Sequence, residues 1–412
     1  MIYGLIGEHL GHSFSAEIHA RLGEEPYELQ ELPPEQVGEF LKTGDFRGIN
    51  VTIPYKQTVM PYLDEISETA REIGAVNTIV RRQGKLYGDN TDAAGLTLLL
   101  RRIGADLRGK KVLILGTGGT SRTAGYAARK LGASAVIRVS RTAREDAVTY
   151  EQAAAEHRDA QILINTTPCG MYPRGGECPL NPADYPGLEA VADAVYNPLR
   201  TRLVLKARQL GIPAEGGLFM LTAQAVRAAE LFRDQTYPEG TTEEIYRELL
   251  REKENMVLIG MPGSGKSTLS AALRQRTGRP AADTDTLIRE RAGKSIPEIF
   301  REDGEDVFRE LESAVIAKVS ARGGQIIATG GGAVLRPENV TILKQNGRLI
   351  LLERPAEQLT ATPDRPLADT QEKMERLWRE REPVYRAAAD CSIRLCGTPE
   401  EAAAEVESRW LE

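Results

Sequence analysis

The sequence predicts an α/β protein with mainly parallel sheets, in which a two-lobed N-terminal part precedes a domain with its own central parallel sheet. Two observations carry this prediction. Strand-like apolar runs alternate with helical stretches from one end of the 412-residue chain to the other. Two glycine-rich loops, 116–122 and 260–267, each follow a short apolar run and open a helical stretch. Loops in that position bind phosphate through backbone amides, and these two suit a dinucleotide and a nucleoside triphosphate, respectively.

The elements follow one another in three series. The first lobe, residues 1–92, has strand-like runs near 2–7, 27–32, 47–53 and 75–81, with helical segments between them. The second lobe, 93–217, has strand-like runs at 110–116, 135–141, 160–166 and 190–196. Helical stretches at 218–232 and 241–253 follow the second series, and we expect them to complete the first lobe. The last domain is expected at 254–412, beginning with the strand before the second glycine loop.

Composition excludes several classes of protein. A formal net charge of −6 provides no general attraction for nucleic acid or anionic lipid. No apolar run approaches the length of a membrane span, and the N-terminus has the pattern of a first strand. The four cysteines match no zinc spacing, so we expect reduced thiols. We therefore expect a soluble, multidomain protein of the cytoplasm; its oligomeric state is left open.

The first glycine loop has two of the three glycines of a dinucleotide-binding motif, with Ser121 where the third often stands. Such glycine pairs also occur in ordinary strand-to-helix turns. The end of the next strand favours a cofactor, because Ser140-Arg141-Thr142 stands where an NAD-binding chain places an acid. An acid would repel a 2′-phosphate, whereas Arg141, with Arg144 nearby, can bind one. A solvated surface arginine is the alternative for either residue alone, but together they favour NADP over NAD.

A proton donor for carbonyl reduction is predicted in the first lobe. Lys56, held by a carboxylate such as Asp92, can donate or relay a proton, a step worth about 10²–10⁴ in rate. A lysine and an aspartate this far apart are usually unrelated. Here, however, polar clusters at 50–56, 74–78 and 88–92 follow predicted strands, where open α/β sheets place their sites.

At these residues the chain resembles shikimate dehydrogenase over residues 1 to about 250. The blocks that carry the resemblance are His12-Ser13-Phe14-Ser15, the three polar clusters, Asn165-Thr166-Thr167-Pro168, 193–198 and 217–224. The resemblance implies that Lys56 and Asp92 form the catalytic pair. It implies substrate contacts at Ser13, Ser15, Thr52, Asn77, Tyr196 and Gln224. It implies NADP contacts at Gly116, Gly118, Gly119, Ser140, Arg141, Thr142, Arg144, Gly217 and Met220.

The second glycine loop, Gly260-Met261-Pro262-Gly263-Ser264-Gly265-Lys266-Ser267, fits the pattern GxxxxGK[ST]. The strand before it and the helical pattern after it predict a P-loop. An ordinary glycine-rich turn would not explain a Lys-Ser pair at the start of a helix. Lys266 is expected to neutralise the β/γ-phosphate oxygens, and Ser267 to ligate Mg²⁺. The predicted ATP contacts are Gly263, Ser264, Gly265, Lys266, Ser267 and Thr268.

Three features beyond the P-loop suggest a phosphate acceptor site. Asp283-Thr284-Asp285 offers two acids after the next strand-like run, although a solvated acidic turn would look the same. Arg309 and Glu312 lie one helical turn apart, which by itself is an ordinary ion pair. Gly330-Gly331-Gly332 ends another strand and exposes amides where a side chain would clash.

This combination resembles shikimate kinase over about 255–412. The resemblance implies that Asp283 supports Mg²⁺ and that Asp285 takes the proton of the acceptor hydroxyl. It implies that Arg309 and Arg381 bind the substrate carboxylate, that Gly331 and Gly332 line the pocket, and that Arg365 belongs to a lid over the phosphates.

Together the two resemblances imply a bifunctional enzyme of the shikimate pathway. It would reduce 3-dehydroshikimate to shikimate with NADPH, then phosphorylate shikimate with ATP and Mg²⁺. Two alternatives stay open. A weak kinase half is one, because Ala361-Thr362 stands where the family has an Arg-Thr pair before a lid that is short here. A sensor without catalysis is the other, although it would be expected to lose Lys56, Asp92, Lys266 or Asp283, and all are present.

Overall fold

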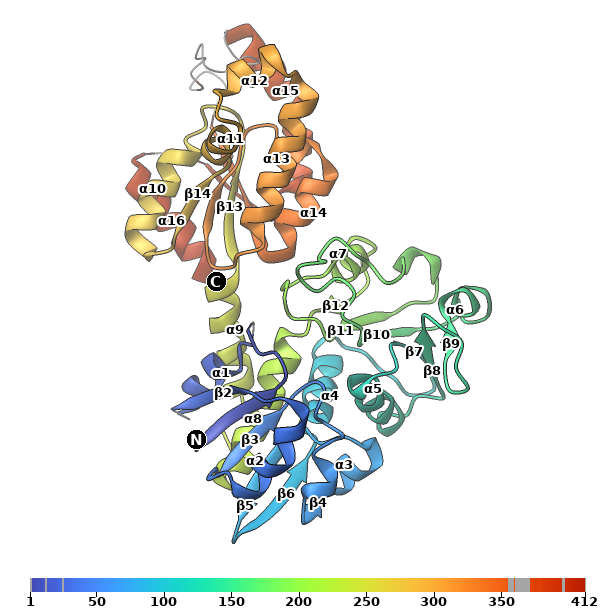
Figure 1. Ribbon diagram of the computed structural model, residues 1–412. Coiled ribbons are helices and arrows are strands. Elements are labelled where there is room, and N and C mark those ends of the chain that lie inside the picture. Colours follow the sequence, from blue (N-terminus) through green and yellow to red (C-terminus); the bar gives the residue numbers. More distant parts are fainter. Residues whose placement is uncertain are drawn as a thin grey trace. The chain divides into compact units, whose positions relative to one another are not determined.

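The computed structural model describes residues 2–11, 13–23, 26–354, 359, 371–394 and 397–411 (Figure 1). The chain forms two compact units, Met1–Glu248 and Leu249–Glu412. In the described ranges, none of the helices combines the length and the apolar character needed to span a membrane. The α/β fold class expected from the sequence is confirmed in both units.

The first lobe is built on a six-stranded sheet with the order β2-β1-β3-β5-β6-β4. Its strands are β1 (Tyr3–Gly7), β2 (Tyr27–Glu31), β3 (Gly48–Val51), β4 (Glu65–Ile66), β5 (Thr78–Arg82) and β6 (Lys85–Asp89). β1 pairs in parallel with β2 and β3, but β5 pairs antiparallel with both β3 and β6. Neither β6 nor the antiparallel pairs were predicted from the sequence. The β5–β6 turn at Gln83 and Gly84, with φ values of 50° and 79°, permits this tight reversal.

Helices cover this sheet and carry several of the predicted site residues. They are α1 (Ser15–Arg21), α2 (Val37–Thr43), α3 (Glu68–Ile73), α4 (Asp92–Arg102), α8 (Leu218–Arg233) and α9 (Thr241–Lys253). α4, which precedes the second-lobe strands, packs along α8, which follows them. Residues 218–248 belong to the same compact unit as residues 1–92, and the boundary between the units falls within α9, so residues 249–253 belong to the second unit.

The second lobe has a six-stranded sheet, entirely parallel, with the order β12-β11-β10-β7-β8-β9. Its strands are β7 (Lys111–Leu115), β8 (Ala135–Ser140), β9 (Val148–Thr149), β10 (Ile162–Asn165), β11 (Ala190–Asp193) and β12 (Ala214–Glu215). Helices α5 (Gly119–Lys130), α6 (Tyr150–Glu156) and α7 (Arg202–Gln209) connect them. Counted from β7, this is the 3-2-1-4-5-6 order of dinucleotide-binding domains, whose ligands lie at the carboxyl ends of the strands.

The second unit has a five-stranded parallel sheet with the order β14-β15-β13-β16-β17. The strands are β13 (Asn255–Ile259), β14 (Ala281–Asp283), β15 (Ile326–Ala328), β16 (Gly347–Glu353) and β17 (Cys391–Arg394). The helices are α10 (Lys266–Thr277), α11 (Thr284–Ala292), α12 (Ile296–Glu302), α13 (Glu305–Ser320), α14 (Pro337–Asn346), α15 (Gln371–Ala388) and α16 (Pro399–Leu411). Figure 1 shows α10 and α16 on one side of the sheet and α13 and α14 on the other.

Alternation along β13 explains why helices cover both faces of this sheet. Met256 and Leu258 pack against α10 and α16, whereas Val257 and Ile259 pack against α13 and α14. A parallel strand buried on both faces is an uninterrupted apolar run, which is how the sequence displays it. The sheet therefore holds the P-loop, which follows β13, in a rigid frame.

Candidate active sites

The first glycine loop joins β7 to α5. Gly116 has φ +109°, and a Cβ there would lie 2.8 Å from Thr166 Oγ1, so this position requires glycine. The buried Ser121 hydroxyl donates a 2.6 Å hydrogen bond to the Gly116 carbonyl and closes the loop on itself. A Cβ at Gly118 or Gly119 would meet no described atom within 4 Å, so this backbone borders open space. A helix N-terminus beside such an opening is suited to a phosphate.

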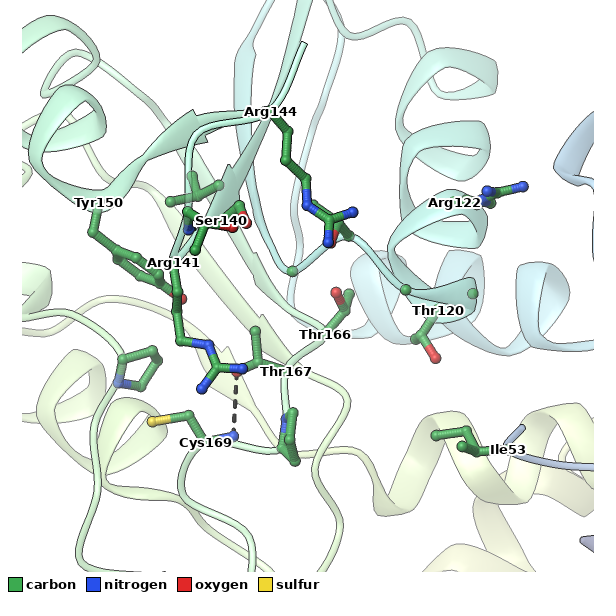
Figure 2. A pocket seen from close by; sticks show the side chains of 18 of the residues that line it. Ile53, Thr120, Arg122, Ser140, Arg141, Arg144, Tyr150, Thr166, Thr167 and Cys169 are labelled. Atoms are coloured by element: carbon green, nitrogen blue, oxygen red, sulfur yellow. Dashed lines mark hydrogen bonds between the residues drawn. The ribbon is translucent and has the colours of Figure 1, made fainter. Parts of the chain in front are cut away.

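That opening is part of a cavity of about 1130 Å³ at the carboxyl ends of the second-lobe strands. Figure 2 shows Arg141 and Arg144 extending into it from the segment after β8, with Thr166 and Thr167 beyond them. Of the residues expected to bind NADP, seven line the cavity: Gly116, Gly118, Gly119, Ser140, Arg141, Thr142 and Arg144. Gly217 and Met220, at the start of α8, are not among its lining residues. Dinucleotide binding is therefore supported at the loop and the arginines.

Several lining residues were not singled out from the sequence, among them Arg122, Tyr150, Cys169, Arg174 and Glu177. Tyr150 begins α6 directly after the two-residue strand β9, which is too short to leave a periodic pattern. The other four come from a helix and from irregular segments whose position depends on the folded lobe. Burial is the main cause that raises the pKa of the Cys169 thiol to about 11, so this thiol stays protonated at neutral pH.

Lys56 and Asp92 form an ion pair beside the cavity, with 2.5 Å between Nζ and Oδ2. Both side chains are mostly buried, at 16% and 11% exposed. Lys56 follows β3, and its carbonyl accepts a 2.7 Å hydrogen bond from the Val76 amide, which anchors its backbone. Asp92 is the first residue of α4, where the helix dipole stabilises a negative charge. Because Lys56 itself lines the cavity, its ammonium group is available to a ligand there.

Asn77 is the centre of a buried polar network. Its side-chain amide donates to Thr91 Oγ1 at 3.1 Å and to Gln224 Oε1 at 3.3 Å, and its oxygen accepts from the Thr91 amide at 2.7 Å. Asn77 and Gln224 are 3% and 7% exposed. The packing of α8 against the first-lobe sheet and α4 thus brings together two predicted residues that are far apart in sequence. Thr91, which was not predicted as a site residue, completes the network.

The predicted serine pair lies at the start of α1. Ser13 Oγ donates to Ser15 Oγ at 3.0 Å, and the Ser15 amide donates to Ser13 Oγ at 3.2 Å. Phe14 lies between them in sequence, and its ring centroid is 5.4 Å from that of Tyr196. Burial raises the pKa of Tyr196, so its hydroxyl stays protonated and can donate a hydrogen bond. Thr52 follows β3, on the same strand end as Lys56.

In the second unit, the P-loop runs from β13 into α10. Lys266 Nζ donates to the carbonyls of Gly260 and Met261, each at 2.8 Å, and so spans the loop. The Ser267 hydroxyl donates to Asp283 Oδ2 at 2.7 Å. Asp283 Oδ1 accepts from the Thr286 amide at 3.1 Å, which caps α11 and fixes the carboxylate.

Ser267 and Asp283 are an oxygen-donor pair that fits Mg²⁺. This ion is commonly bound by one or two protein ligands together with substrate phosphates and waters. Within the described ranges, no cluster of three or more His, Cys, Asp or Glu side chains could hold a metal ion by itself. The donor set therefore suits a metal that arrives with a nucleotide.

Three predicted side chains converge on Gly330–Gly332. A Cβ at Gly330 would lie 2.6 Å from Asp285 Oδ1, and a Cβ at Gly332 would overlap the Arg309 guanidinium. The Gly331 carbonyl accepts from Arg381 Nη1 at 3.3 Å. Gly330 and Gly332 therefore let Asp285 and Arg309 approach the backbone, and Arg381 binds the carbonyl between them.

Two further residues support this cluster. Glu312, which is fully buried, accepts from Arg309 Nη1 at 3.0 Å. Burial is the main cause that raises the pKa of Glu312, and the charge of Arg309 opposes it. The Tyr385 hydroxyl donates to the Gly331 carbonyl at 2.5 Å. The sequence showed the Arg309–Glu312 spacing but not its burial. Arg365 and the Ala361-Thr362 pair lie outside the described residues.

Comparisons with known proteins match each half of the chain. The family model "Shikimate dehydrogenase substrate binding domain" matches residues 5–79, and the model "Shikimate kinase" matches 262–410. The NADP(+)-dependent shikimate dehydrogenase of Clostridium perfringens strain SM101 is 37% identical over 266 residues, which cover 60% of this chain and 98% of that protein. That of Halothermothrix orenii is 38% identical, covering 56% and 90%.

Solved structures give the same match for the first unit. A chorismate mutase/shikimate 5-dehydrogenase fusion protein from Clostridium acetobutylicum is 35% identical with a TM-score of 0.57, covering 60% of this chain and 96% of that one. Shikimate 5-dehydrogenase from Thermus thermophilus, in complex with NADP(H) and shikimate, is 32% identical with a TM-score of 0.53, covering 60% and 99%.

Proposed function

The chain belongs to the shikimate dehydrogenase family and ends in a shikimate kinase domain, and from this premise we propose how its residues perform both reactions. The first reduces 3-dehydroshikimate to shikimate with NADPH, and the second transfers a phosphoryl group from ATP to shikimate with Mg²⁺. The observation that carries the proposal is the Lys56–Asp92 pair, which lies beside a cavity with the features of an NADP site.

In the reductase, NADPH supplies the hydride when bound. The ketone oxygen needs a proton as it becomes a hydroxyl, and Lys56 is the donor at the cavity edge. Asp92 holds the Lys56 ammonium group in place. Water then returns the proton to the lysine.

The remaining first-unit residues orient the substrate and the cofactor. Ser13 and Ser15 offer hydroxyl groups to the substrate carboxylate. Ring hydroxyls would be bound by Thr52, Asn77, Tyr196 and Gln224. For the cofactor, we propose that Gly217 and Met220 lie beside the nicotinamide. The seven predicted residues that line the cavity, Ser140 and Thr142 among them, would surround the phosphates.

In the kinase, Asp285 accepts the proton of the hydroxyl that the reductase has just made. Arg309 and Arg381 bind the carboxylate of the same acid, against Gly331 and Gly332. Lys266 and the loop from Gly263 to Thr268 bind the ATP phosphates, and Ser267 with Asp283 would hold Mg²⁺. These residues act by positioning the two substrates and stabilising negative charge, because the reaction transfers only a proton and a phosphoryl group.

We propose the domain division 1–92 with 218–253 for substrate, 93–217 for NADP and 254–412 for the kinase. The partners proposed are small carboxylic acids in the cytoplasm rather than nucleic acid or membrane. The two alternatives from the sequence are not favoured. A non-catalytic sensor has no need of the Lys56–Asp92 and Ser267–Asp283 contacts, and a shikimate kinase family model matches the second unit.

One reaction tests the proposal. The purified full chain is mixed with 3-dehydroshikimate, NADPH, ATP and Mg²⁺, while NADPH absorbance is followed and products are identified by mass. We expect NADPH oxidation together with shikimate 3-phosphate. Oxidation that stops at shikimate would support the dehydrogenase and contradict the kinase assignment. Formation of neither product would overturn the catalytic proposal.

A further inference from the structure

The shortest strand of the second lobe places an aromatic residue beside the cofactor cavity. β9 pairs in parallel with β8, with Val139 opposite Val148 and Ser140 opposite Thr149. Tyr150 follows β9 at once, so it lies at the carboxyl edge of the sheet, one strand outward from Ser140 and Arg141. Ligands of such sheets lie along this edge. None of the residues assigned to the cofactor above comes from β9 or α6.

Local contacts fix the position of Tyr150. Thr149 and Gln152 form a capping box: Thr149 Oγ1 accepts from the Gln152 amide at 3.2 Å, and Gln152 Oε1 accepts from the Thr149 amide at 2.8 Å. The loop before β9 is closed by an ion pair between Arg138 and Asp146. Tyr150 is therefore the first residue of a capped helix, and the capped helix fixes the position from which its side chain reaches the cavity.

The surroundings of Tyr150 suit a ligand contact. Its half-buried ring packs against the core of the lobe and also lines the cavity. Figure 2 shows the ring alongside Arg141, whose charge acts on the Tyr150 hydroxyl. Burial is the main cause that raises the pKa of Tyr150, so the hydroxyl remains a donor at neutral pH. The described part of the chain provides this hydroxyl with no hydrogen-bond partner.

The strand order predicts which part of a dinucleotide reaches Tyr150. The glycine loop after β7 takes the pyrophosphate, and the end of β8 takes the adenosine ribose. A phosphate on the 2′-oxygen of that ribose points outward from β8, toward the arginines and the end of β9. It carries about two negative charges and three terminal oxygens, and each oxygen can accept more than one hydrogen bond. A further donor can therefore bind the phosphate together with the two guanidinium groups.

Resting on the NADP site proposed above, we propose that Tyr150 is a specificity-determining residue whose hydroxyl donates a hydrogen bond to the 2′-phosphate bound by Arg141 and Arg144. NAD has a neutral hydroxyl at this position and lacks the phosphate oxygens that would accept the hydrogen bond. Tyr150 would therefore contribute to the affinity for NADP and not to the affinity for NAD.

The test compares Tyr150→Phe and Tyr150→Ala with Tyr185→Phe, all in the full chain. Tyr185 is the matched control, because it packs in the same core cluster but does not line the cavity. Dissociation constants for NADP⁺ and NAD⁺ are measured by titration calorimetry. We expect Tyr150→Phe to weaken NADP⁺ binding about tenfold, as for loss of a hydrogen bond to a charged group, and to leave NAD⁺ binding unchanged. Tyr185→Phe should change neither.

Three results would overturn the proposal. An unchanged NADP⁺/NAD⁺ ratio in Tyr150→Phe would show that the hydroxyl does not reach the phosphate. Weaker binding of both nucleotides in Tyr150→Ala, with Tyr150→Phe unaffected, would make the ring a surface for adenine only. A wild-type chain that does not prefer NADP⁺ would contradict the proposed cofactor itself, which distinguishes the two failures.

Discussion

Lys56→Ala is expected to lower the rate of NADPH-dependent reduction by about 10²–10⁴-fold, the usual contribution of a positioned acid or base. The substitution removes the proton donor beside the cavity and leaves Asp92 without its 2.5 Å partner. Steady-state kinetics with 3-dehydroshikimate and NADPH would measure the effect. We expect kcat to fall and the KM for NADPH to stay nearly the same, because the arginines proposed to bind its 2′-phosphate are unchanged.

Lys85→Ala is the matched control for Lys56→Ala. Lys85 is in the same lobe and is also paired with a carboxylate, Glu65 at 3.2 Å, but it is 67% exposed. Its loss should change the reduction rate by less than about twofold, because exposed ion pairs contribute little. Shikimate phosphorylation should continue in both variants. A Lys56→Ala enzyme with nearly normal kcat would refute the assignment of the proton donor, and loss of both activities would show that the two halves are not independent.

Strands that are buried on both faces are among those that the sequence predicted. Val112–Leu115 and Met256–Ile259 are such runs, and both lie where expected. β6 alternates exposed and buried residues on a hairpin, and β9 and β12 have only two residues each, so none leaves a long apolar run. The expectation of mainly parallel sheets is confirmed, and among the described strands the antiparallel pairs lie in the β3–β5–β6 part of the first lobe.

The candidate sites could be predicted where one short, continuous segment contains the residues that bind the ligand. The P-loop and the loop at Gly116 are of this kind, because strand, turn and helix follow one another directly. Contacts that need distant segments were not predictable from spacing. Asn77, just before β5, meets Gln224 because α8 packs on the first-lobe sheet as well as on α4. In the sequence, Glu312 has the spacing of a surface ion pair with Arg309, and only the packing of α13 in the folded domain shows that it is buried. The roles of these residues stay predictions until variants are measured.

In the kinase, Asp285→Asn is expected to lower phosphorylation turnover by about 10²–10⁴-fold at saturating ATP and Mg²⁺. Asparagine has nearly the same shape, so it still fits against Gly330, where an added Cβ would lie 2.6 Å from the present carboxylate oxygen. It cannot accept the proton of the acceptor hydroxyl. Product formation followed by mass, with shikimate and ATP varied, would show a fall in kcat with little change in either KM.

Asp283→Asn distinguishes metal binding from proton transfer, because Asp283 and Asp285 contact different parts of the domain although both lie where β14 meets α11. Asp283 faces Ser267 on α10, whereas Asp285 faces the backbone after β15. Asparagine at 283 can still cap α11 and keeps one oxygen ligand. Its defect should therefore be relieved by more Mg²⁺, while that of Asp285→Asn should not. If both variants respond to Mg²⁺ alike, the two acids form one metal site, and the proton must leave the hydroxyl through another group.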